Sequence, residues 1–175
     1  MNQTLIAEEN GIAQALLEEF EREYVTTRKF LERLPNDKLS WRPHPKSMSA
    51  GELGLHIAET PGGALRMGLL DRASPPDTTR RAEATSVAEL LSLIDDSAVF
   101  VRGTLSTVTD AKMQGTFALD LPDGSTFELP RSRFIRSVML NHWYHHRGQF
   151  GVYLRLLGVS VPSSYGPSGD ELGGI

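Results

Sequence analysis

Apolar residues recur at every third or fourth position over four long stretches of this sequence, and this spacing restricts the fold more than any other feature. Residues spaced in this way lie on one face of an α-helix, so each stretch predicts an amphipathic helix. The stretches cover approximately residues 5–34, 49–70, 86–107 and 131–157. With 175 residues, the chain has the usual size of one domain. We therefore predict a single domain over residues 1–175, an all-α four-helix bundle.

Signals for the beginning and the end of a helix delimit these stretches. Ser49 and Glu52 have the spacing of a capping box, in which each side chain binds the backbone amide of the other residue. Ser86 and Glu89 have the same spacing at the start of the third stretch. Gly158 follows the last stretch and is a typical cap at the C-terminus of a helix.

Proline and glycine mark the segments where the helices should be interrupted. Pro61-Gly62-Gly63 predicts a kink or a short break in the second helix, because proline lacks an amide hydrogen and glycine weakens a helix. Residues 116–120 and 125–129 favour β-strands and flank a Pro-Asp-Gly turn, which predicts a small β-hairpin at the periphery of the bundle. We expect a loop over residues 72–84 and an irregular tail over 161–175.

The composition excludes several classes of function. The chain has no cysteine, so it offers no disulfide, no thiolate ligand and no cysteine nucleophile. Its formal net charge is −4 at pH 7, so no basic field would hold a phosphate backbone, and we expect no nucleic-acid partner. No apolar run approaches the length of a membrane span, and the first residues lack a basic segment followed by an apolar core. We therefore expect a cytoplasmic protein with no membrane partner.

Three of the five histidines, His142, His145 and His146, lie within five consecutive positions. Residues four apart lie one turn above each other on a helix, so His142 and His146 would present two imidazoles to one point, a spacing that metal ligands use. A third ligand must come from elsewhere in the chain. His56 is a better candidate than His44, because it lies in an apolar-periodic stretch, whereas His44 lies between two prolines. The alternative is that these histidines are packed and hydrogen-bonded without a metal.

The chain resembles the DinB-like superfamily of metal-dependent bacterial proteins over nearly its whole length. The resemblance rests on Trp41-Arg42-Pro43, Leu53-Gly54-Leu55-His56-Ile57-Ala58-Glu59, Asn141-His142, His145-His146-Arg147-Gly148-Gln149 and Pro162-Ser163-Ser164-Tyr165-Gly166-Pro167-Ser168. It implies a four-helix bundle whose second helix supplies one histidine and whose last helix supplies a pair spaced by four. The metal ligands would then be His56, His142 and His146. Imidazole suits several divalent ions; we expect zinc or nickel, with iron or copper as alternatives.

Relatives in this family include transferases and isomerases that use low-molecular-weight bacterial thiols. The resemblance therefore implies a thiol-dependent S-transferase-like enzyme whose metal activates the thiol for attack on a small electrophile. A metal-dependent hydrolase with the same ligands is a second hypothesis. A third is a stress-associated bundle that binds a metal or a small ligand without turnover. Because homodimers are common among the relatives, the resemblance also implies a homodimer.

Several residues near the predicted ligands have roles that the sequence leaves open, and no catalytic residue is assigned. Glu52 and Glu59 lie one turn on either side of His56 and are candidates for a general base. Arg147 either holds a substrate carboxylate or faces solvent. His145 is either a residue of the pocket or a packed or surface histidine.

Overall fold

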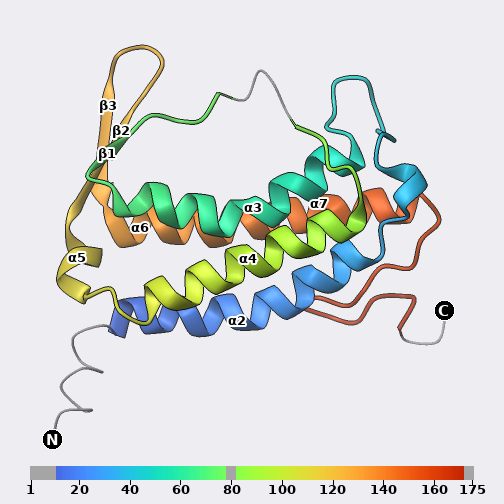
Figure 1. The fold of residues 1–175 in the computed structure, drawn as a ribbon, viewed down its shortest axis with the longest axis horizontal. Helices are drawn as coiled ribbons and strands as arrows, with labels where there is room; N and C mark the ends of the chain where they lie inside the picture. Colours follow the sequence, from blue (N-terminus) through green and yellow to red (C-terminus); the bar gives the residue numbers. More distant parts are fainter. Residues whose placement is uncertain (1–10, 78–81, 172–175) are drawn as a thin grey trace, which may run out of the picture.

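The computed structural model describes residues 11–77 and 82–171, and most of them are helical (Figure 1). The long helical elements are α2 (Gly11–Glu32), α3 (Ala50–Leu69), α4 (Val87–Leu105), and a C-terminal run of α6 (Arg131–Ile135), η2 (Arg136–Asn141) and α7 (His142–Leu156). They lie side by side and share one apolar core (Figure 1). The mainly helical fold predicted from the sequence is therefore confirmed.

Parts of three predicted segments lie outside the described residues. These parts are the start of the first helix at 5–10, the positions 78–81 in the loop, and the end of the tail at 172–175. Within the described residues, none of the helices combines the length and the hydrophobicity that a bilayer crossing requires.

The predicted helix caps are present, one of them only in part. Ser49 Oγ accepts a hydrogen bond from the Glu52 amide at 3.1 Å, and the Glu52 carboxylate accepts one from the Ser49 amide at 2.6 Å, so this capping box is complete. At the start of α4, Ser86 Oγ accepts from the Glu89 amide at 3.1 Å. The Glu89 carboxylate binds the amide and the hydroxyl of Thr85 instead of the Ser86 amide. The second box is therefore half formed.

A small sheet lies at one end of the helices (Figure 1). Strands β2 (Thr116–Asp120) and β3 (Thr126–Pro130) form the predicted antiparallel hairpin. Its turn uses Gly124 at a φ of +83°, which favours glycine. Strand β1 (Arg72–Ala73) pairs with β2 in parallel, so part of the segment expected to be a loop adds a third strand. Two short helices, η1 (Asn36–Lys38) and α5 (Asp110–Gln114), connect the longer elements.

Pro61 lies inside α3, which continues past it, so the predicted short break is wrong, while the alternative of a kink stays a prediction. Proline removes the amide hydrogen that would bind the Ile57 carbonyl, and the Trp143 Nε1 donates to that carbonyl at 2.9 Å. At the next position, Gly62 allows α4 to approach, because a Cβ there would lie 3.1 Å from Ser97 Oγ. Neighbouring helices therefore supply the contacts that keep the proline and the glycine inside a helix.

The last predicted helix is not a uniform α-helix. Between α6 and α7, residues 136–141 form the π-helix η2. A π-helix has i→i+5 hydrogen bonds, so it changes the direction in which all following side chains point, compared with a continuous α-helix. Because α7 begins at His142, directly after this segment, the π-helix sets the direction of the histidine pair.

Candidate metal centre

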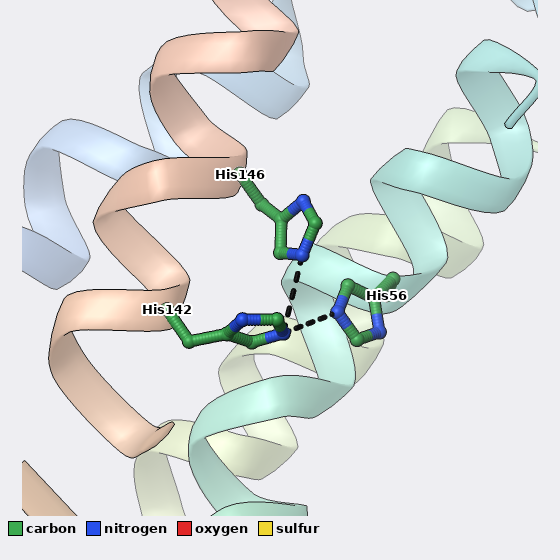
Figure 2. A group of neighbouring side chains, drawn as sticks. All are labelled: His56, His142 and His146. Carbon is green, nitrogen blue, oxygen red and sulfur yellow. Dashed lines mark hydrogen bonds between the residues drawn. The ribbon is translucent and has the colours of Figure 1, made fainter. Parts of the chain in front are cut away.

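Three histidines from two helices meet at one point. His56 lies in α3, and His142 and His146 lie one turn apart in α7 (Figure 2). The Nε2 of His142 is 3.0 Å from the Nε2 of His56 and 3.1 Å from the Nε2 of His146. The candidate ligand atoms of all three residues lie within 4.8 Å of one another. The structure thus brings together the three histidines that the sequence analysis selected.

The arrangement of the rings suits a divalent cation. With Zn–N bonds of about 2.0–2.1 Å and tetrahedral angles, ligand nitrogens lie roughly 3.3 Å apart, which is close to the observed spacing. The rings of His56, His142 and His146 meet edge to face, with interplanar angles of 86°, 88° and 90°, so their nitrogens converge and the rings do not stack. Three imidazoles leave the fourth tetrahedral position for water or a substrate.

A hydrogen bond fixes the orientation of one of these rings. Gln149 lies one turn after His146, and its Oε1 is 3.0 Å from the His146 Nδ1. An amide oxygen only accepts, so Nδ1 carries the hydrogen and Nε2 keeps its lone pair for a metal. The sequence analysis missed this role of Gln149. The signal that could have revealed it is the spacing of three between His146 and Gln149 on one helix face.

Burial keeps the imidazoles of His142 and His146 uncharged at neutral pH, because it lowers their pKa values. Desolvation is the main reason that the pKa of His146 is lowered to about 4, and it outweighs the hydrogen bond that His146 donates to Gln149, which raises that pKa. Desolvation also lowers the pKa of His142, and the neighbouring His145 lowers it further. Neutral imidazole is the form that binds a metal, so both residues are ready to act as ligands.

The histidines line a cavity of about 500 Å³, which lies within the usual range for small-molecule sites. Met48 and Leu55 supply apolar parts of its wall. Glu52, Glu59 and Asp77 supply carboxylates. An organic molecule in this cavity can therefore reach the histidines and pack against apolar surface at the same time.

The two candidates for a general base both line this cavity but differ in their surroundings. The Glu52 carboxylate binds the Ser49 amide in the helix cap and lies 3.7 Å from the Arg42 guanidinium. Desolvation raises the pKa of Glu59, and the charge of Glu89 raises it further. Because Glu52 is engaged in capping α3, Glu59 is the better candidate for exchanging a proton with a bound molecule.

The other two histidines lie outside the cluster. His145 is exposed on α7, and its ring centroid lies 4.9 Å from that of His146. It is not among the described residues that line the cavity, so the structure favours the surface alternative. His44 is exposed in the linker before α3, where its Nδ1 accepts a hydrogen bond from the Lys46 amide at 3.1 Å.

Arg147 does not face solvent, which was one of its two alternatives. The residue is 2% exposed, and its guanidinium donates to the Glu23 carboxylate and, at 3.2 Å, to Thr27 Oγ1 on α2. The guanidinium also lies 5.4 Å from the ring centroid of Tyr144 and 5.1 Å from that of Tyr165. Arg147 therefore joins α7 to α2 and to the C-terminal tail. It does not face solvent, and it is not among the described residues that line the histidine cavity.

The sequence matches the model of the DinB family over residues 1–172. It is also similar to the uncharacterized protein YrdA from Bacillus subtilis, with 26% identity over an alignment of 159 residues; the match covers 89% of this chain and 89% of that protein.

Two solved structures have the same fold. A DinB-like protein from Bacillus cereus is 26% identical, with a TM-score of 0.68 over 87% of this chain and 97% of that chain. YfiT from Bacillus subtilis is 14% identical, with a TM-score of 0.62 over 85% of this chain and 89% of that chain. YfiT is described as a probable metal-dependent hydrolase with an unusual four-helix bundle topology. At this identity, the similarity to YfiT concerns the fold alone.

Proposed function

The chain belongs to the DinB family, and from this premise we propose that it is a metal-dependent enzyme acting on a small organic molecule. His56, His142 and His146 would hold the divalent cation. The observation that carries the proposal is the convergence of these three imidazoles on the wall of a cavity of about 500 Å³. Structural metal sites usually have four protein ligands. Within the described residues three ligands converge, which leaves room for a substrate and favours catalysis.

Transfer of a thiol sulfur to a small electrophile is the reaction that we propose first. A divalent cation with an open position lowers the pKa of a thiol or of water there, so that either becomes a nucleophile near neutral pH. The chain has no cysteine, so a nucleophilic sulfur must come from a second substrate, a low-molecular-weight thiol. Met48 and Leu55 would pack against the carbon skeleton of the electrophile.

Hydrolysis is the second candidate, and Glu59 is the observation that favours it. Glu59 lines the cavity one turn after His56 on the same helix, and desolvation raises its pKa. A carboxylate with a raised pKa is a stronger base, so Glu59 would take a proton from attacking water. This role matters less for a thiol, which is more acidic than water and loses its proton more easily. The description of YfiT as a probable metal-dependent hydrolase agrees with this second candidate.

Turnover assays with and without a thiol separate these reactions. Zinc- or nickel-loaded protein is incubated with a panel of epoxides, α-haloketones and esters, in the presence and absence of a low-molecular-weight thiol. Loss of the electrophile only when both metal and thiol are present, with a product that contains the thiol, supports sulfur transfer. Loss without thiol that is abolished in Glu59→Gln supports hydrolysis. Metal-loaded protein that turns over none of these compounds would contradict both reactions and favour binding without catalysis.

A further inference from the structure

We propose that Trp143 is a positioning residue for the histidine cluster, an inference that rests on the proposed metal-binding role of that cluster. Trp143 directly follows His142 in α7, and Ile57 directly follows His56 in α3. The indole Nε1 of Trp143 donates a hydrogen bond to the Ile57 carbonyl at 2.9 Å. A single hydrogen bond thus joins the residues next to two of the three proposed ligands.

Pro61 makes the Ile57 carbonyl available for this bond. In an α-helix, a carbonyl accepts a hydrogen bond from the amide four residues later, which for Ile57 is position 61. Proline has no amide hydrogen, so α3 cannot supply that donor. Ile57 is 1% exposed, and a buried carbonyl without a partner is costly. The proline therefore creates a requirement that Trp143, from another helix, satisfies.

Burial, stacking and a hydrogen bond together fix the position of the Trp143 indole ring between the helices. Trp143 is fully buried, and its ring stacks on Phe20 of α2 with centroids 5.4 Å apart and an interplanar angle of 18°. An indole N–H can only donate, so the bond to Ile57 has one direction. Moving α7 along or around α3 would break the hydrogen bond, and moving it along α2 would break the stacking.

The position of this bond in the chain matters for the ligands. Trp143 is the second residue after the π-helix η2, where the register of the last helix departs from that of a continuous α-helix. A shift of the register of α7 by one residue would turn His142 by about 100° around the helix axis and away from His56. Because Trp143 is adjacent to His142, its bond to α3 stabilises the register in which the two Nε2 atoms lie 3.0 Å apart.

Two substitutions separate positioning from general stability. Trp143→Phe keeps an aromatic ring on Phe20 but removes the donor. Pro61→Ala restores a helix amide that satisfies the Ile57 carbonyl within α3. The double variant therefore has a satisfied Ile57 carbonyl but lacks the hydrogen bond from residue 143 to α3. Tyr144→Phe is the matched control, because it removes an aromatic hydrogen bond from the same helix to Glu19 of α2 at 2.9 Å.

For each protein, we would measure urea unfolding without metal, zinc affinity by chelator competition, and the visible spectrum of the cobalt-loaded form. Trp143→Phe is expected to be less stable than the wild type and to bind zinc about tenfold more weakly. The double variant should lose less stability relative to Pro61→Ala than Trp143→Phe loses relative to the wild type, because only the cost of the smaller buried ring remains. It should still bind zinc about tenfold more weakly than Pro61→Ala and show an altered cobalt spectrum. Tyr144→Phe should bind zinc like the wild type.

The outcomes distinguish this inference from the proposed function. The positioning role would be overturned if the double variant had the same zinc affinity and the same cobalt spectrum as Pro61→Ala. The lower stability of Trp143→Phe would then be enough to explain its weaker zinc binding. An equal loss of affinity in Tyr144→Phe would overturn it as well. A wild-type protein that binds no zinc would overturn the metal role itself, and the inference with it.

Discussion

The Nε2 atoms of His56 and His142 lie 3.0 Å apart, although 86 positions separate the two residues in the chain. They come from α3 and α7, and His146 joins them from the next turn of α7 (Figure 2). Each of the three imidazoles therefore occupies a different side of the same small space. A metal in this space would be bound by all three imidazoles, so removing any one ring should weaken its binding to the other two.

We expect protein purified without a metal-affinity tag to carry a nearly stoichiometric divalent cation after incubation with zinc or nickel. His56→Ala, His142→Ala and His146→Ala should each lose it, because two imidazoles bind much more weakly than three. Elemental analysis of dialysed protein measures the content directly. The exposed His145 and His44 are the matched controls, and their alanine variants should keep the metal. Full metal content in any of the three cluster variants would contradict the assigned ligands.

Gln149→Leu should weaken zinc binding by about 10–100-fold, the usual effect of removing a partner of a metal-binding histidine. The leucine removes the acceptor that lies 3.0 Å from the His146 Nδ1, so that ring loses its fixed tautomer and orientation. Gln149→Glu keeps an acceptor in place and should retain affinity. Chelator competition measures both variants. Equal zinc affinities of the Gln149→Leu and Gln149→Glu variants would contradict this prediction.

Arg131→Met should lower the free energy of unfolding by about 3 kcal/mol, because it removes a buried guanidinium that donates to several buried or partly buried carbonyls. The Arg131 guanidinium is 2% exposed and donates to the Lys112 carbonyl at 3.1 Å and to the Asp71 carboxylate at 2.9 Å. It also donates to the Gly68 carbonyl in the last turn of α3. Urea denaturation of the metal-free protein measures the change. Arg133→Met, at an exposed position two residues away, should change stability by no more than about 0.5 kcal/mol.

The attachment of the C-terminal tail should weaken in acid as Asp170 is protonated. Its carboxylate binds the Arg155 guanidinium at 2.6 and 3.0 Å and the Val161 amide at 2.8 Å, and these contacts, the Arg155 bond first, lower the pKa of Asp170 to about 2. A depressed pKa means that the detached tail binds protons more readily than the attached one. The contribution of Asp170 to the attachment is therefore fully present above pH 3.8, the ordinary pKa of the group, and is lost as the pH falls through about 2.

Hydrogen exchange of the Val161 amide tests this behaviour. Asp170→Asn should reduce the protection of that amide at neutral pH, and the difference from the wild type should shrink between pH 3.8 and 2. Asp96→Asn, at an exposed position on α4, should leave the protection unchanged. A difference that stays constant over the whole pH range would show that the carboxylate charge is not responsible.

Local patterns were sufficient to predict much of the fold and of the candidate site. Apolar spacing predicted the long helices, Ser49 and Glu52 predicted the cap of α3, and a Pro-Asp-Gly turn predicted the hairpin. These signals act over a few residues, so they can be read without knowing the neighbours in space. The spacing of four between His142 and His146 is of the same kind. The apolar-periodic stretch around His56 made it the candidate for the third ligand, and the resemblance to a family implied the same residue.

Only the tertiary structure decided how the remaining residues are used. Arg147 is buried because Glu23 and Thr27, more than a hundred residues earlier, provide its partners. Pro61 stays inside a helix because Trp143 satisfies the carbonyl that it leaves free. A buried charge or a missing donor is tolerated only when a distant part of the chain compensates for it, and no pattern within a few residues contains that information. The sequence by itself thus determined the helices and the candidate ligands, while packing between helices determined the register in which those ligands meet.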